Sequence, residues 1–172
     1  MLTQILFWLF ALVAVGSAMM MVSRRNPVSS ALWLIGTFFA LAAIYTLLGA
    51  YFIGVIQILV YAGAIMVLFL FVIMLLNLGN QYQPDLRSDT WKAVAAGCSL
   101  ILLALLGRVV GGGLTPGLDE RGARVAEQVA EHGAVGAIGI PMFTDFAVHL
   151  QVAGLLLLVA VVGAVVLAKR NV

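Results

Sequence analysis

The sequence predicts an all-α, polytopic membrane protein with five transmembrane helices. Of its 172 residues, 64% are hydrophobic and only 9% are charged, whereas a soluble domain carries about 25% charged residues. The mean hydropathy of +1.17 is correspondingly high. A chain of this composition would expose too much apolar surface if it folded in water. Helix is the expected form of each span, because an open sheet would leave backbone groups without hydrogen-bond partners in hydrocarbon.

Five apolar runs approach or exceed about 20 residues, the length that a helix needs to cross a bilayer. The fourth run has Lys92 and Arg108 near its ends, but both side chains can snorkel to the headgroups along their alkyl stems. The segment of about 111–145 is expected to be an external loop, with a short surface helix over roughly 119–132. Within a single membrane domain of residues 1–172, the expected spans are about 2–22, 28–49, 52–76, 91–110 and 146–168.

The basic residues of the short links predict the orientation of the spans. With five spans, three basic clusters fall on one side of the membrane, and the uncharged link around 49–51 falls on the other. The positive-inside rule therefore places the N-terminus outside and the C-terminus in the cytoplasm. The three clusters are Arg24 with Arg25, Arg87 with Lys92, and Lys169 with Arg170.

Several function classes are excluded by the polar residues. The single cysteine, Cys98, cannot form an internal disulfide or a cysteine-based metal or iron–sulfur site. His132 and His149 are too far apart to form a metal-binding motif. No basic tract suggests nucleic acid as a partner.

The third span carries a polar stripe. At 3.6 residues per turn, one helix face collects Gly54, Gln57, Tyr61, Ala64 and Leu68. Burial of an amide without a partner costs roughly 4–8 kcal/mol in a hydrocarbon-like medium, and one buried apolar side chain contributes only about 1.5–3 kcal/mol. We therefore expect Gln57 to face protein or water rather than lipid.

Gly63 has two interpretations. Small residues such as those of 62-AGA-64 let helices approach closely, and a glycine beside a tyrosine could also host a π-bulge. The central turns of spans one, two, three and five contain no ionisable acid, base or histidine, although proton pumps generally hold one at depth. The chain is therefore a better candidate for a wall or gate in a pathway whose charges belong to other chains.

Four stretches carry a resemblance to a known family: 26-NPVSSALWLI-35, 49-GAYFIGVIQILVYAGAIMVLFLFVIMLLNL-78, 143-FTDF-146 and 153-AGLLLLVAVVGAVVLA-168. They resemble subunit J of bacterial respiratory complex I, the counterpart of mitochondrial chain 6 of NADH:quinone oxidoreductase. The resemblance implies a non-redox subunit of the membrane arm, in the bacterial cytoplasmic (inner) membrane, that helps to couple quinone reduction to proton translocation. Its partners would be quinone-site and antiporter-like subunits. FMN, iron–sulfur clusters and quinone would lie in partner subunits, with no cofactor, metal or catalytic residue in this chain.

The resemblance also implies a mechanism for the third span. In that family the third helix can carry a π-bulge near the tyrosine that matches Tyr61, and its conversion to regular helix is thought to gate a water path. The candidate gate residues are Tyr61, Gly63, Gln57, Gly54 and Ala64.

This chain departs from the family at two positions. Many relatives have Glu where it has Gln57 and Gln151, so two titratable groups are replaced by amides. A conformational gate does not need them. Asp145 and His149, four residues apart at the start of the fifth span, are further minor candidates for a proton exit, or else a solvated helix start.

Two alternatives stay open. The chain could be the equivalent subunit of a related hydrogenase or ferredoxin-linked membrane complex, since the electron donor binds elsewhere. It could also be a stand-alone channel or structural membrane protein. Co-purification with flavin and iron–sulfur subunits would distinguish the last alternative from the first two.

Overall fold

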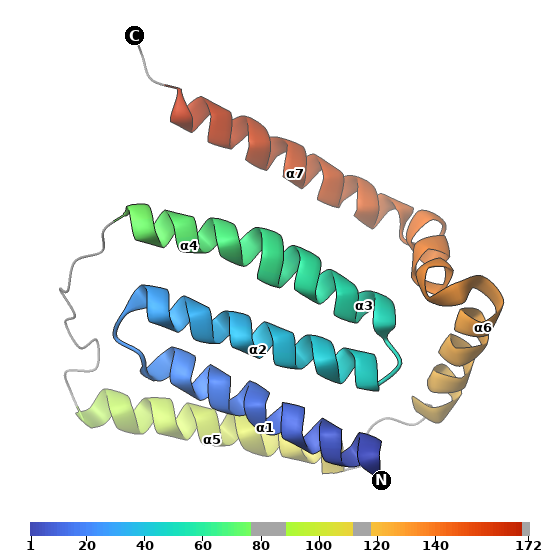
Figure 1. The fold of residues 1–172 in the computed structure, drawn as a ribbon, viewed down its shortest axis with the longest axis horizontal. Coiled ribbons are helices and arrows are strands. Elements are labelled where there is room, and N and C mark those ends of the chain that lie inside the picture. The colour runs from blue at the N-terminus through green and yellow to red at the C-terminus, as the bar shows by residue number, and fades with distance from the viewer. Residues whose placement is uncertain (77–88, 112–117, 170–172) are drawn as a thin grey trace. The chain divides into compact units, whose positions relative to one another are not determined.

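The computed structural model describes residues 1–76, 89–111 and 118–169. Every regular element in these ranges is helical, and the chain divides into two compact units, Met1–Pro116 and Gly117–Val172 (Figure 1). The first unit contains α1 (Leu2–Ser23), α2 (Pro27–Leu47), α3 (Tyr51–Ile56), the π-helix η1 (Gln57–Ile65), α4 (Met66–Leu75) and α5 (Asp89–Gly111). The second contains α6 (Leu118–Phe143) and α7 (Ala147–Ala168).

Among the residues that the structure describes, four helical segments are long and apolar enough to cross a membrane: α1, α2, the continuous α3–η1–α4 segment, and α7. The apolar part of α5, Ala93–Val109, is shorter. These helices begin and end close to the expected boundaries, and the described part of the chain is all-α and apolar, as predicted. Of the basic residues that predicted the orientation, Arg87 and Arg170 lie outside the described residues.

The sequence between α1 and α2 forms a tight, capped turn. The Asn26 side-chain oxygen accepts hydrogen bonds from the backbone N–H groups of Val28 (2.9 Å) and Ser29 (3.4 Å), which otherwise lack partners at a helix N-terminus. Pro27 occupies the first helical turn, where its missing N–H costs nothing. The Ser30 hydroxyl donates to the Met21 carbonyl at 2.6 Å, and this bond ties the two helices together beside the turn.

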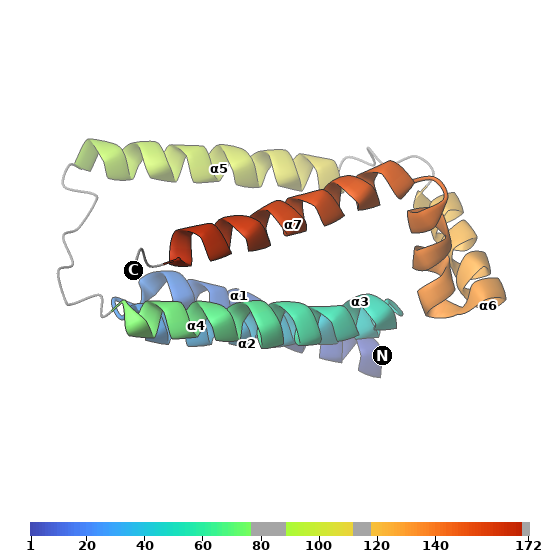
Figure 2. The same ribbon diagram turned by 90° about the horizontal axis from the view of Figure 1, so that it is seen from above.

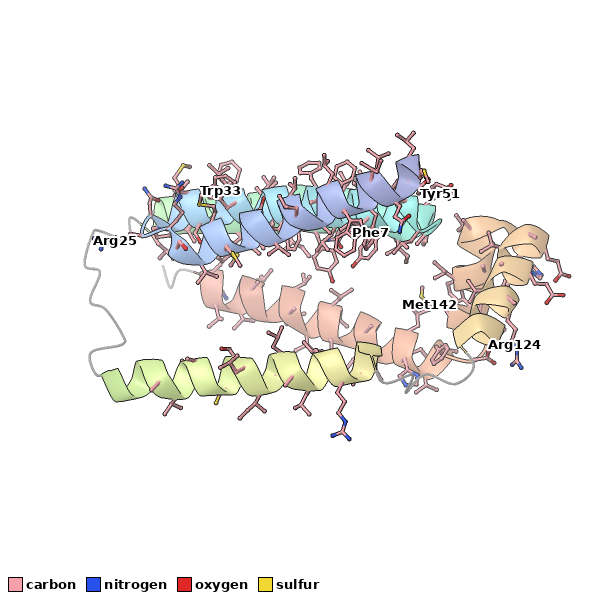
Figure 3. The ribbon with its side chains drawn as sticks, turned by 90° about the horizontal axis from the view of Figure 1, so that it is seen from below. Phe7, Arg25, Trp33, Tyr51, Arg124 and Met142 are labelled. Atoms are coloured by element: carbon pink, nitrogen blue, oxygen red, sulfur yellow. The ribbon has the colours of Figure 1, made fainter. Side chains whose placement is uncertain are left out.

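Small residues line the contact between α1 and α2. Ala14 and Ser17 are buried on α1. A Cβ placed on Gly36 of α2 would lie 3.6 Å from the Ser17 hydroxyl oxygen, an ordinary van der Waals contact. Close approach of two backbones is the main source of helix association in lipid, where apolar burial gives little driving force. Figure 3 shows Trp33 and Arg25 near the turn end of this hairpin and Tyr51 at the opposite end.

The third span packs against α2. The connecting turn contains Gly49 at φ +81°, a conformation that favours glycine. The buried centre of the contact is formed by Ala31 of α2 with Met66 and Ile73 of α4. Leu34, Ile35, Phe38 and Leu70 are partly buried around it. The elements α1, α2 and α3–η1–α4 therefore lie side by side, as Figures 1 and 2 show.

The second unit contains more helix than the short surface element expected over roughly 119–132. Helix α6 continues to Phe143, so the uncharged residues after Gly133 are helical as well. Gly133, at φ 73° and ψ 169°, breaks α6 into two parts with different directions. A turn closed by the Asp145 and Phe146 N–H groups on the Pro141 carbonyl leads into α7. No residue of α7 is buried in the isolated chain.

A π-helical turn in the third span as the candidate functional site

The third span is not a regular α-helix throughout. Residues Gln57–Ile65 form a π-helix, and the N–H of Met66 still donates to the Tyr61 carbonyl, five residues earlier. Such wide turns are rare and are often found at functional sites. Of the two interpretations of the glycine beside Tyr61, the structure therefore contains the π-helical one.

The π-helix moves the buried stripe by one residue. Gly54 and Gln57 are buried as expected, but the next buried residues are Ala62 and then Met66. The step from Gln57 to Ala62 is five residues, where a regular helix would step by three or four. Every later position of the stripe is displaced accordingly.

The expected stripe is therefore wrong after Gln57. Tyr61 is 47% exposed and Leu68 is 67% exposed in the isolated chain, and Ala64 is exposed as well. A stripe predicted at 3.6 residues per turn assumes unbroken i→i+4 hydrogen bonds. The π-helical turn contains one additional residue, so the predicted positions after Gln57 are displaced by one. Ala62 and Met66 are the residues that sequence reasoning missed.

Gln57 occupies the buried side of the third span, where it retains 9% of its exposure. This burial agrees with the expectation that its amide faces protein rather than lipid. Within the described part of the chain the Gln57 side chain makes no hydrogen bond to another residue, and no polar atom is fully enclosed without a partner. The amide is therefore available to water or to a polar group of another chain.

Gly54 is the point of closest approach between α3 and α2. A Cβ placed on Gly54 would lie 2.8 Å from the Thr46 hydroxyl oxygen and 3.0 Å from the Ala42 carbonyl oxygen. Thr46 cannot easily turn away, because its hydroxyl donates to that same Ala42 carbonyl at 2.9 Å. Only glycine fits at this contact, so the first turns of the third span are held against α2.

Gly63 has a different role from Gly54. It is exposed, so no described helix of the first compact unit packs on it. A Cβ placed there would lie 3.3 Å from the Ile58 carbonyl oxygen, which belongs to the same π-helical turn. Glycine therefore relieves crowding inside the turn itself, and close packing within the described part of the first unit does not explain it.

Tyr61 projects from the π-helical turn toward α2. Its ring lies against that of Phe38 in a T-shaped arrangement, with 5.8 Å between centroids and 66° between planes. This geometry is one that aromatic pairs prefer. Tyr61 therefore sits at the edge of the buried stripe, next to the position that Ala62 occupies.

The minor candidates belong to the second compact unit. Asp145 lies in the turn before α7, while His149 and Gln151 lie in the first turns of that helix, and all three side chains are exposed. Asp145 and His149 form no ion pair in this part of the structure, and the His149 ring instead contacts Phe146 at 5.6 Å. The structure thus gives these residues no shared site. No group of three or more potential metal ligands occurs among the described residues.

The family model for NADH-ubiquinone/plastoquinone oxidoreductase chain 6 matches residues 17–167. The chain belongs to this family. The chain 6 match includes α2, the whole third span and nearly all of α7, so the π-helical turn lies inside the region that defines the family. The resemblance inferred from the sequence is confirmed, and with it the assignment as a multi-pass membrane protein.

Individual members of the chain 6 family are similar along most of their length. NADH-quinone oxidoreductase subunit J of Rhodobacter capsulatus is 36% identical over 167 residues, which cover 96% of this chain and 81% of that protein. NAD(P)H-quinone oxidoreductase chain 6 of Leptolyngbya boryana is 38% identical, covering 96% and 79%. Subunit J of Escherichia coli strain K12 is 32% identical, covering 92% and 82%.

Proposed function

We propose that the chain is a non-redox membrane-arm subunit of a proton-translocating NADH:quinone oxidoreductase, and that its π-helical turn gates a water path. The names of its relatives and the family match support the first part. The π-helix at Gln57–Ile65 is the single observation that supports the second. The complex would lie in the bacterial cytoplasmic membrane, with five spans in this chain, an external N-terminus and a cytoplasmic C-terminus.

The gate would work by a change of register. Conversion of the π-helical turn to α-helix replaces the i→i+5 hydrogen bonds with i→i+4 bonds, so the turn contains one residue fewer. The part of the third span after the turn then rotates by about 100° about the helix axis. Tyr61 would then take the place of Ala62 against α2, and Ile65 the place of Met66. A phenol hydroxyl would enter the stripe beside the Gln57 amide, which changes the groups that can orient water there.

The ionisable groups of such a pathway would belong to other subunits. The side chain of Gln57 is an amide, which can donate and accept hydrogen bonds but has no titratable proton to store. Quinone-site and antiporter-like subunits would supply these ionisable groups. They or other partners would hold the quinone, FMN and iron–sulfur clusters.

Purification of the tagged chain from native membranes tests the first part of the proposal. We expect flavin-containing and iron–sulfur subunits to co-purify and the isolate to couple NADH oxidation to quinone reduction. Activity with reduced ferredoxin or hydrogen, but not with NADH, would assign the chain to a related complex. A free small oligomer without redox-active companions would identify it as a separate channel or structural protein.

Two variants test the gate in inverted membrane vesicles, where proton uptake and NADH oxidation are measured together. Gly63→Leu should impair proton uptake, because its side chain crowds the Ile58 carbonyl and blocks the turn. Tyr61→Phe keeps the ring and removes the hydroxyl, so it measures the contribution of that hydroxyl to water orientation. Normal proton uptake in an assembled Gly63→Leu complex would remove this turn from the mechanism.

A further inference from the structure

Phe38 of α2 contacts both sides of the register boundary. Its ring meets Tyr61, which stands just outside the buried stripe. It also packs against the cluster of Ala31, Met66 and Ile73, which forms the stripe beyond the π-helix. Among the described residues, no other ring contact joins α2 to the third span.

A change of register would bring Tyr61 into conflict with Phe38. In the observed register the stripe position nearest to Tyr61 is filled by Ala62, which is 6% exposed and offers room for a methyl group only. A phenol ring at that position needs far more space on the side facing α2. Because the Phe38 ring lies 5.8 Å from the Tyr61 ring, it is the first group that has to move.

We propose that Phe38 is a latch that holds the third span in its π-helical register. It acts in two ways: its ring contact stabilises Tyr61 outside the stripe, and its bulk occupies the space into which Tyr61 would turn. Phe38 is thus a positioning residue that sets the resting state of the gate. The inference depends on the proposed gating function, and it adds the element that regulates the register.

The proposed role of Phe38 predicts which of the two registers gains when its ring is removed. An edge-to-face aromatic pair is strong enough to shift an equilibrium about two- to tenfold beyond the effect of its buried area. Removal of the Phe38 ring should therefore raise the ratio of the α-helical to the π-helical register by about two- to tenfold. The opposite change, loss of the α-helical register, is not expected from any truncation of Phe38.

Cysteine cross-linking in the intact, membrane-embedded complex reports the register directly. Cys98, an exposed residue of α5, is first replaced by Ser to give a cysteine-free chain. Ala31→Cys is then paired either with Met66→Cys, which shares a buried cluster with Ala31 in the observed register, or with Ile65→Cys, which would take the place of Met66 after conversion. Ile65 is 49% exposed in the observed register, so its pair should cross-link poorly with a short thiol-specific reagent.

The expected result is a shift in the ratio of the two cross-links. With Phe38 present, the 31–66 pair should dominate. With Phe38→Ala, the ratio of the 31–65 to the 31–66 product should rise by about two- to tenfold. If the Phe38→Ala complex does not assemble, Phe38→Leu keeps apolar bulk and should give a smaller rise, and Tyr61→Leu removes the same ring contact from the other side.

Two matched variants serve as controls. Phe39→Ala removes a neighbouring ring that is 50% exposed and has no ring contact with the third span, so its ratio should equal that of the wild type. Phe38→Tyr keeps an aromatic ring and should restore the wild-type ratio. An unchanged ratio in Phe38→Ala, or an equal rise in Phe39→Ala, would overturn the latch.

Failure of the Phe38 latch can be distinguished from failure of the proposed gating function. If the register responds to Phe38 while Gly63→Leu pumps protons normally, the latch exists but the gate does not. If Gly63→Leu abolishes pumping while the cross-link ratio ignores Phe38, the gate exists and another contact holds it.

Discussion

The third span and α7 are both long, apolar helices within the family match, yet they use their surfaces differently. The third span buries Gly54, Gln57 and Ala62 against α2, whereas α7 buries no residue in the isolated chain. The third span carries a deeply placed amide and a close-contact glycine. In α7 the amide of Gln151 is exposed. Gly154 is also exposed, and a Cβ placed on it would meet no neighbouring side chain within 4 Å.

This difference shows that apolar length and helix packing are separate properties. Length and hydropathy place a helix in the bilayer, and both segments have them in full. Packing in lipid depends on small residues that meet another backbone. A small residue contributes only where the partner helix is present, as α2 is for the third span.

The largest effect is expected from the pair of substitutions Gly54→Leu and Gly154→Leu. Leu at position 54 would force its Cβ to 2.8 Å from the Thr46 hydroxyl oxygen, and overpacking of this kind costs about 1–3 kcal/mol. A Cβ placed on Gly154 would meet no side chain or neighbouring element of the second compact unit within 4 Å. Thermal unfolding of the detergent-solubilised chain, followed by circular dichroism, should therefore show a lower midpoint for Gly54→Leu only. Equal midpoints would mean that α2 does not hold the third span.

A helix cap should have the next largest effect. Asn26→Ala removes the side-chain oxygen that accepts from Val28 and Ser29, so the free energy of unfolding should fall by about 1 kcal/mol. The start of α7 has no side-chain cap, because Phe146 precedes it. Phe146→Ala should consequently leave the cap contribution unchanged, and chemical denaturation of both variants measures the difference.

Gly63→Ala should change the register rather than the packing. Alanine favours α-helix over glycine by about 1 kcal/mol, and its Cβ would lie 3.3 Å from the Ile58 carbonyl within the π-helical turn. Both effects favour the α-helical register by roughly fivefold. The measurement is the ratio of 31–65 to 31–66 cysteine cross-links, and Gly163→Ala on α7 should leave it unchanged.

The smallest effect on stability is expected at Gln57. Gln57→Met keeps the shape and removes the amide, and no hydrogen bond within the described chain is lost. The free energy of unfolding should change by less than about 0.5 kcal/mol, whereas proton uptake by vesicles containing the complex should fall. A clear loss of stability would show that the amide serves the fold rather than a water path.

Much of the candidate site could be predicted before the structure. Gln57 was expected to avoid lipid because a buried, unpaired amide is costly, and it is buried against α2. Gly63 beside Tyr61 suggested a π-helical turn as one of two interpretations. The faces of Tyr61, Ala64 and Leu68 were predicted incorrectly, and the contact of Phe38 with Tyr61 gave no signal in the sequence.

The reason is the composition of the second half of the span. Residues 66–75 are uniformly apolar, MVLFLFVIML, so their hydrophobic pattern is the same in any register. The insertion of one residue at the π-helical turn changes every contact after it without changing any residue type. Sequence periodicity can detect such a shift only where polar and apolar residues alternate.

The amino-acid sequence by itself determined the long apolar helices, their membrane character and the family. The helices and their membrane character follow from local composition. The family follows from the order of the residues, which does not depend on the register of a helix. The tertiary structure decided which side chains of the third span face α2. Gly63 admits the wide turn from within the third span itself. Which residue then faces α2 depends on the fit of Ala62 rather than Tyr61 beside Phe38, and that fit needs both helices.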